Sequence, residues 1–325
     1  MLESMLIAAK CSDVGVVREH NEDAATIDVI HLPGLDAQQS AILAAVADGM
    51  GGHASGEIAS RIAIDSFKET ISSLLMPGIA SISNFSMATT QAINNANAQV
   101  YKAGKDDPEN HGMGTTLTTA IVVSGVLYVG HVGDSRAYLI RNGAVRQLTH
   151  DHSVVQEKLD EGLITAEEAA QSDERNLLRK AIGIRSDVTA DATIEELYDD
   201  DVIILCTDGL YNSVGEQDFI DAVAYHQNPQ AICDALVESA KVRDGSDNIT
   251  VVCLMMRPSE STPRNMPQKH AVRIPGRIML GMMLLLVLVL ICLTISYILK
   301  KTGEPISPKL IRQQGIPMRG NSYRP

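Results

Sequence analysis

Acidic residues stand at the ends of several apolar stretches of this 325-residue chain. The stretches are typical of β-strands, and a strand fixes the direction in which the next side chain points. The acids are Glu22, Asp23, Asp48, Asp134, Asp208 and Asp247. Ligands that are all oxygens suit Mg²⁺ or Mn²⁺ and do not suit zinc. The pattern therefore favours a divalent-metal site assembled from distant parts of the chain.

Two of these acids share a local sequence. Asp48-Gly49 and Asp208-Gly209 each follow a run of apolar residues. The glycine permits a sharp turn and allows a backbone carbonyl to approach an ion. Taken alone, Asp-Gly is also an ordinary turn sequence.

The other acids also have ordinary alternatives. Asp134 lies where a hairpin turn would lie, Asp247 where a strand-edge turn would lie, and Glu22-Asp23 could form a solvated turn. Their joint occurrence favours the metal interpretation, because acids at strand ends are costly to bring together without cations.

Arg18 lies four residues before Glu22. Its guanidinium suits bidentate phosphate binding, with a plain surface arginine as the alternative.

Composition and charge narrow the class of protein. The chain is 45% hydrophobic, with no Trp and three Phe, so its core must be aliphatic. Residues 1–256 carry 16 Lys and Arg against 38 Asp and Glu, whereas residues 257–325 carry 11 against 2. The strongly acidic charge of residues 1–256 argues against nucleic-acid binding, and it is compatible with the binding of cations.

The five cysteines form no CxxC pair, which favours reduced cytosolic thiols over disulfides or a zinc site.

The carboxyl-terminal part of the sequence predicts a membrane anchor. Residues 278–299 carry no charge, and 22 residues in a helix span about 33 Å, enough to cross a bilayer. A buried core helix is the alternative. Residues 257–277 predict a Pro-rich linker, and 300–325 a short disordered tail. Because nothing resembling a signal peptide opens the sequence, we expect a single-pass protein of the cell (inner) membrane with residues 1–277 in the cytoplasm.

Alternating and apolar runs predict strands at 25–32, 41–47, 116–123, 126–132, 136–140, 144–148, 201–206 and 249–255. Helical periodicity covers 56–75, 84–105, 216–225 and 229–242. Asn142-Gly143 is the strongest hairpin signal, and the short connections around it require antiparallel pairing. Strands come in batches with helices between them, which favours an α+β fold with antiparallel sheets covered by helices. Residues 151–187 interrupt the strands and predict an inserted helical flap near the site.

In order and spacing, residues 11–256 resemble the metal-dependent Ser/Thr protein phosphatases of the 2C class, bacterial type. The matching segments are Ser12-Asp13-Val14-Gly15 with Arg18 and Asn21-Glu22-Asp23, Asp48-Gly49-Met50-Gly51-Gly52, Gly112-Met113-Gly114-Thr115-Thr116, Gly133-Asp134-Ser135-Arg136, Leu148-Thr149 with Asp151-His152-Ser153, Cys206-Thr207-Asp208-Gly209 and Asp247-Asn248-Ile249-Thr250. The resemblance implies a sandwich of two antiparallel sheets flanked by helices on both sides. It makes residues 1–256 the phosphatase domain, and it implies that the flap at about 151–187 shapes substrate choice.

The resemblance also implies the role of each site residue. Two Mn²⁺ or Mg²⁺ ions would share a bridging ligand and a water, and Arg18 would bind the substrate phosphate. The implied ligands are Asp48 as the bridge, Asp208 and Asp247 for one ion, Glu22 and the Gly49 carbonyl for the other, and Asp134 with Asp208 for a weaker third ion. Asp23 would not bind a metal ion itself but would orient the residues that do. The implied reaction is direct attack by a metal-activated water on the phosphoester, with no phosphoenzyme.

One residue departs from the pattern of many eukaryotic members. They have a proposed general-acid histidine where Met50 stands, and a thioether cannot donate a proton. His53 does not align with that position, and we interpret it as a loop histidine. We interpret His150 and His152 as structural. The leaving group must therefore take its proton from a metal-bound water or another side chain.

The leading interpretation is a membrane-anchored phosphatase that acts on phosphoserine and phosphothreonine proteins. It would oppose a Ser/Thr protein kinase at the same membrane and would bind no nucleic acid. Two alternatives belong to other classes. One is a catalytically dead scaffold that binds phosphoproteins, although this chain keeps every metal-binding acid. The other is a phosphomonoesterase of small metabolites.

Overall fold

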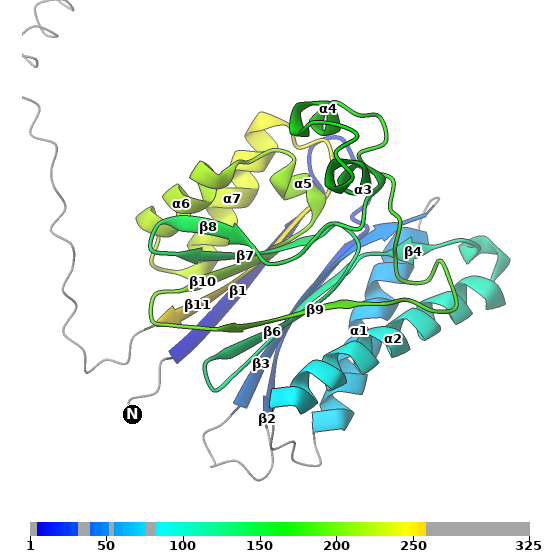
Figure 1. The fold of residues 1–325 in the computed structure, drawn as a ribbon, viewed down its shortest axis with the longest axis horizontal. Helices are drawn as coiled ribbons and strands as arrows, with labels where there is room; N and C mark the ends of the chain where they lie inside the picture. Colours follow the sequence, from blue (N-terminus) through cyan, green and yellow to red (C-terminus); the bar gives the residue numbers. More distant parts are fainter. Residues whose placement is uncertain (1–4, 32–39, 52–54, 76–81, 258–325) are drawn as a thin grey trace, which may run out of the picture. The chain divides into compact units, whose positions relative to one another are not determined.

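Two antiparallel sheets pack face to face in the computed structural model, which describes residues 5–31, 40–51, 55–75 and 82–257 (Figure 1). The first sheet has the order β1-β11-β10-β7-β8. Its strands are β1 (Met5–Asp13), β7 (Arg136–Arg141), β8 (Ala144–Gln147), β10 (Val202–Cys206) and β11 (Ile249–Arg257). The second has the order β2-β3-β5-β6-β9, with β4 paired to β3. Its strands are β2 (Asp23–His31), β3 (Ser40–Met50), β4 (Gly114–Thr115), β5 (Leu117–Val123), β6 (Val126–Val132) and β9 (Asp191–Glu196).

Helices cover the outer face of each sheet, giving four layers (Figure 1). The second sheet is covered by α1 (Ser55–Leu75) and α2 (Ile82–Asp106), which is followed by the short 3₁₀ helix η1 (Pro108–Asn110). The first sheet is covered by α5 (Asp208–Tyr211), α6 (Glu216–Tyr225) and α7 (Pro229–Arg243). This arrangement confirms the predicted α+β class with two antiparallel sheets flanked by helices.

The side-chain period of two explains why β3 is apolar from Ala41 to Ala47. Leu43, Ala45 and Ala47 belong to the core under α1 and α2. Ala44 and Val46 belong to the core between the two sheets. A strand buried on both faces is a continuous apolar run, and small alanines allow a close approach of the layers.

The hairpin predicted at Asn142-Gly143 is confirmed, because Arg141 pairs with Ala144 across it. Asn142 and Gly143 have φ values of 53° and 74°, as a type I′ turn requires. The turn around Asp134 is different. The strands on its two sides, β6 and β7, belong to different sheets, so Asp134 lies where the chain crosses from one sheet to the other.

Three strands of the structure were not predicted, and one of them is the two-residue strand β4. The edge strand β9 has the sequence Asp-Ala-Thr-Ile-Glu-Glu, whose apolar positions are too few to mark a strand. The strand β1 opens the chain, and its register with β11 is a contact between the two ends of the domain that local patterns do not reveal.

The predicted flap at 151–187 contains α3 (Val154–Asp160) and α4 (Ala166–Ala170), in the connection between β8 and β9. The predicted segments at 278–299 and 300–325 and His53 lie outside the described residues, as does the predicted linker except Arg257, which ends β11. Among the described residues, no helix combines the length and the hydropathy needed to span a membrane.

Candidate metal and phosphate site

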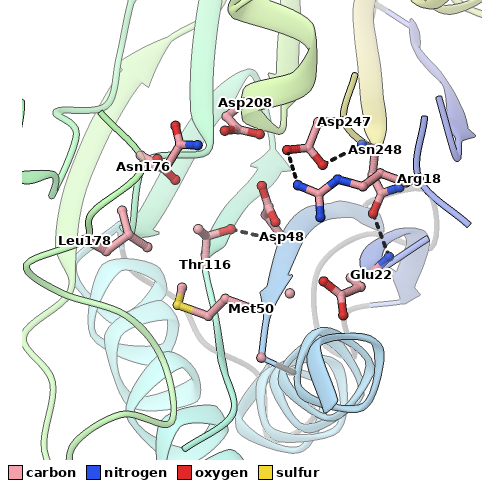
Figure 2. Close-up of a pocket in the computed structure, with 13 residues that line it drawn as sticks. Arg18, Glu22, Asp48, Met50, Thr116, Asn176, Leu178, Asp208, Asp247 and Asn248 are labelled. Atoms are coloured by element: carbon pink, nitrogen blue, oxygen red, sulfur yellow. Dashed lines mark hydrogen bonds and ion pairs between the residues drawn. The ribbon is translucent and has the colours of Figure 1, made fainter. Parts of the chain in front are cut away.

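Seven of the eight predicted site residues line one pocket of about 250 Å³ (Figure 2). They are Arg18, Glu22, Asp48, Gly49, Asp134, Asp208 and Asp247. Both sheets supply them. Asp48 ends the apolar part of β3 and Asp134 follows β6, whereas Asp208 follows β10 and Asp247 precedes β11. Residues up to 229 positions apart in the sequence therefore meet at one end of the sandwich.

The backbone of Glu22 is fixed by three hydrogen bonds. Its N–H donates to Asn248 Oδ1 at 2.8 Å (Figure 2). Its carbonyl accepts from the Ser60 hydroxyl at 2.6 Å and from the Gly49 N–H at 3.2 Å. Asn248 also donates to the carbonyl of His20, so its amide holds the loop that carries the carboxylate. These contacts position Glu22 against β3 and α1.

Asp48 is held at the centre of the pocket by Thr116. The Asp48 N–H donates to Thr116 Oγ1 at 2.8 Å, and the Thr116 N–H donates to the Asp48 carbonyl at 2.9 Å. Figure 2 shows Asp48 between Glu22 and Asp208. Asp23 is the direct cross-strand partner of Asp48 in the β2–β3 register. Like charges directly opposite one another destabilise a sheet, so this pair needs compensation.

Asp23 is the predicted residue that does not line the pocket, and it lies behind Asp48. Its Oδ2 accepts from the Thr207 hydroxyl at 2.8 Å. Its Oδ1 is buried with no hydrogen-bond partner in the described part of the chain. A buried, unpaired carboxylate oxygen is costly.

The pocket raises the pKa of its carboxyl groups. Burial is the main cause for Asp48, and the charges of Asp23 and Asp208 add to it. Burial also raises the pKa of Asp208, with Asp247 as the next cause. For Asp134 burial comes first and Asp208 second. Each carboxylate therefore makes the ionised form of its neighbours less favourable.

This donor set fits divalent cations of the Mg²⁺ or Mn²⁺ type. It contains only oxygen ligands, the acids are buried or half-buried, and one oxygen of Asp23 lacks a partner. Within the described residues, however, no three acidic, His or Cys side chains are already gathered closely enough to form a metal cage. Arg18 occupies one oxygen of Asp247, and the carboxylates repel one another across the pocket. The assignment of individual metal ligands stays a prediction.

Arg18 is the cation of the pocket. Its Nη2 lies 2.8 Å from Asp247 Oδ2, and half of its side chain is exposed (Figure 2). An exposed ion pair of this kind contributes only about 0–1 kcal/mol to stability. The guanidinium can therefore turn toward a phosphate group at little cost.

Flap residues complete the pocket, and no sequence pattern predicted them. Asn176 and Leu178 line it opposite Glu22, beside Met50 of β3 (Figure 2). Neither belongs to a recognisable motif, because the flap has no regular pattern. Their place depends on the flap backbone, in which Ser153 pairs with Leu178 and the Val154 N–H donates to the Leu177 carbonyl at 2.8 Å.

Two glycines allow α1 to approach the end of β3, and Gly56→Ala tests this contact. A Cβ at Gly56 would lie 2.7 Å from Glu22 Cδ and 2.9 Å from the Gly49 carbonyl carbon. We expect the added methyl to displace Glu22 and to lower kcat/KM by about tenfold or more, since misplaced catalytic groups lose large factors in rate. Steady-state turnover of p-nitrophenyl phosphate measures the effect.

Gly215→Ala is the matched control for this prediction. Gly215 precedes α6, and a Cβ there would meet one carboxylate oxygen at 4.0 Å. Its activity should equal that of the unchanged chain. Full activity of Gly56→Ala at unchanged metal concentration would contradict the importance of the glycine contact.

His152 connects the flap to the turn that carries Asp134. Its Nδ1 accepts from the Gly133 N–H at 3.1 Å, and its carbonyl accepts from the Arg179 N–H at 2.7 Å. The ring stacks on His131 with centroids 4.9 Å apart. His152 is buried and outside the pocket lining, which agrees with a structural role.

Acid sensitivity of folding should follow from His131. Burial lowers its pKa to about 3, whereas an unfolded histidine titrates near 6.5. Between these values the unfolded state binds more protons, so the free energy of unfolding falls as pH decreases below about 6.5. Against His131→Gln, the unchanged chain should lose about 1.2 kcal/mol more of its free energy of unfolding between pH 6 and pH 5. Urea unfolding of both proteins at each pH measures this, because all other titrating groups are shared. If the free energy of unfolding falls equally with pH in both proteins, His131 is not the group that makes folding sensitive to acid.

Comparison with known proteins places this arrangement in a family. A family model described as protein phosphatase 2C matches residues 19–235. The serine/threonine phosphatase stp of Listeria welshimeri is 34% identical over 245 residues, which cover 74% of this chain and 92% of that protein.

Solved structures agree with the sequence comparison. The Mycobacterium tuberculosis serine/threonine phosphatase PstP/Ppp superposes with a TM-score of 0.68 at 33% identity, covering 78% of this chain and 99% of that one. The catalytic domain of PstP in complex with two manganese ions gives 0.67 at 31% identity, covering 79% of this chain and all of that one. The chain, with its acidic pocket at one end of a helix-covered double sheet, therefore belongs to the protein phosphatase 2C family of serine/threonine protein phosphatases.

Proposed function

We propose that this phosphatase removes phosphate from phosphoserine and phosphothreonine in proteins by direct hydrolysis, with two divalent cations held in the acidic pocket. The observation that carries the proposal is the meeting of five buried or half-buried acids and Arg18 around one pocket. Asp48, Asp208 and Asp247 would hold one ion, and Asp48, Glu22 and the Gly49 carbonyl the other. Asp134 with Asp208 would hold a third, weaker ion. The catalytic domain of PstP is in complex with two manganese ions, which supports the proposal of two cations here.

When bound, the cations would supply Lewis acidity, which lowers the pKa of a water at the pocket. The chain's own residues do the rest. Thr116 and Asn248 hold the backbone of Asp48 and Glu22, so the carboxylates are oriented before substrate arrives. Arg18 leaves Asp247 and donates to the phosphate oxygens. Asp23 orients its cross-strand neighbour from behind the pocket.

Protonation of the leaving serine or threonine oxygen cannot come from Met50. Met50 lines the pocket, and a thioether has no proton to give. None of the described residues that line the pocket is a histidine. Because the pocket is open to solvent, a water molecule is the proton donor that the site favours.

The assay that tests this function compares three substrate classes in one preparation. Phosphoserine and phosphothreonine peptides should be hydrolysed faster than a phosphotyrosine peptide and faster than small phosphorylated metabolites. A phosphopeptide labelled with ³²P should leave no label on the acid-quenched enzyme, because direct hydrolysis forms no phosphoenzyme. A preference for the metabolites would favour the alternative, a small-molecule phosphomonoesterase.

We also propose that residues 278–299 anchor the enzyme in the cell membrane, with the catalytic domain in the cytoplasm. There it would remove phosphate groups that a Ser/Thr protein kinase at the same membrane adds. The support is the uncharged 22-residue run and the switch from an acidic body to a basic end. Leu286→Arg with Leu288→Arg should move the full chain from the membrane to the soluble fraction, because each central arginine disfavours insertion by about 2.5–3.5 kcal/mol. Unchanged fractionation of this double variant would refute the anchor.

A further inference from the structure

A second hollow lies beside the catalytic pocket. It is a groove of about 510 Å³ whose wall is formed by residues 176–189, which are the last part of the flap and the two residues after it. Met50, Asn176 and Leu178 line both the groove and the catalytic pocket. A substrate chain whose phosphoresidue reaches the carboxylates would therefore continue directly into the groove.

The wall of this groove is fixed to the body of the domain. Ile182 exchanges two backbone hydrogen bonds with Thr115, of 2.8 and 3.0 Å. Asn97 of α2 clamps the next turn, since its Oδ1 accepts from the Gly183 N–H at 2.8 Å and its Nδ2 donates to the Arg185 carbonyl at 3.0 Å. A groove whose wall is already ordered binds a peptide without the entropic cost of ordering a loop.

Large apolar side chains are exposed along this wall. Leu177 is 53% exposed and Ile184 is 45% exposed, and both line the groove. Ile184 packs over Gly114, where any Cβ would meet its Cδ1 at 2.6 Å. Exposed apolar groups in a concave surface next to an active site mark a place where ligand side chains bind.

The charge of the groove is opposite to that of the acidic domain around it. Three cations line it, Arg179, Lys180 and Arg185, against one carboxylate, Asp187. Arg179 is paired with Glu157 at 2.6 Å, and Lys180 lies 3.6 Å from Asp191. Among the described residues, Arg185 is exposed and forms no ion pair, so its charge is available to a ligand.

We propose that this groove holds the substrate polypeptide beside the phosphoresidue and selects a segment that carries an acidic and a large apolar side chain there. The proposal rests on the protein phosphatase activity and adds a sequence preference to it. Leu177 and Ile184 would contact the apolar side chain, and Arg185 would pair with the acid.

The first test measures kcat/KM for phosphothreonine peptides that differ only in flanking residues. One set carries Glu and Leu on either the amino-terminal or the carboxyl-terminal side, and a matched set carries Lys and Leu. We expect the acidic peptides of one side to be hydrolysed about three- to tenfold faster than their lysine counterparts. Equal rates on both sides would overturn the proposal.

Arg185→Glu tests the residue itself, with Lys102→Glu as the matched control. Lys102 is exposed on α2 and lines neither hollow, and its substitution changes the charge by the same amount. Arg185→Glu should lower the acidic-to-lysine ratio about three- to tenfold, whereas Lys102→Glu should keep the ratio of the unchanged chain. A ratio that is lowered equally by both variants, or by neither, would show that general charge or another surface sets the preference.

The apolar contact has its own matched pair. Leu177→Ser should raise KM for leucine-bearing peptides, and Leu163→Ser, which alters another exposed flap leucine outside the groove, should not. Turnover of p-nitrophenyl phosphate, which is too small to reach the groove, normalises each preparation for active enzyme. If the unchanged chain hydrolyses no phosphopeptide, the proposed function is refuted. If it hydrolyses phosphopeptides without any preference for their flanking residues, only the proposed role of the groove is refuted.

Discussion

Replacement of Asp48 by asparagine is expected to lower kcat about a thousandfold or more, equivalent to about 4 kcal/mol in activation free energy. Asp48 lies at the centre of the pocket, and the proposed site uses its carboxylate for both ions. The amide keeps the size of the side chain and leaves the backbone hydrogen bonds to Thr116 in place. Turnover of p-nitrophenyl phosphate and of a phosphothreonine peptide checks the loss.

For the same variant we expect no loss of stability, in contrast to its loss of activity. Burial and neighbouring charges disfavour the ionised Asp48, so a neutral amide should not lower the Tm of the metal-free protein. Asp65→Asn, at an exposed position of α1, is the control and should keep full activity. Substantial activity of Asp48→Asn would contradict the proposed centre, and a collapsed circular dichroism spectrum would show a purely structural role. Asp208→Asn should behave as Asp48→Asn does.

Removal of divalent metal is expected to abolish activity, and Mn²⁺ or Mg²⁺ should restore it. Cations between the carboxylates would relieve their repulsion, so binding should also stabilise the fold. At a metal concentration 100 times Kd the gain is about 2.7 kcal/mol, which for a domain of this size corresponds to a rise in Tm of about 5–10 °C. Activity and thermal melting after EDTA treatment, with and without added metal, measure both effects.

Asp48→Asn provides the control for the melting experiment, because it should lose most of the metal-dependent rise in Tm. Unchanged turnover in excess chelator would refute metal-dependent hydrolysis. A rise in Tm of equal size in the variant would place the stabilising ion elsewhere on the acidic surface.

The order and spacing of short motifs were enough to predict the sheets and the gathered acids. Asp48 and Asp208 each follow an apolar strand, and an apolar strand determines where its terminal residue lies. The hairpin at Asn142 was readable because only a few residue types adopt two successive positive φ values. The ends of these strands and the hairpin turn depend on interactions that are local in the sequence.

The unpredicted features depend on contacts between distant residues. Asn176 lines the catalytic pocket because Ser153 and His152 hold the flap backbone, and nothing in its own neighbourhood indicates this. Arg18 is paired with Asp247, 229 residues away, a contact that no local pattern reveals. The strand β9 owes its place to pairing with β6, because its own sequence is too polar to specify a buried element.

The last strand of the domain, β11, lies inside its sheet and not at the edge, between β1 from the beginning of the chain and β10. Asp247 and Asn248 immediately precede it. During translation, a ribosome that has added residue 246 therefore holds a polypeptide that still lacks the strand between β1 and β10 and the proposed metal ligand Asp247. Because the proposed site uses Asp247, we expect a nascent chain to gain phosphatase activity only after β11 has left the ribosome.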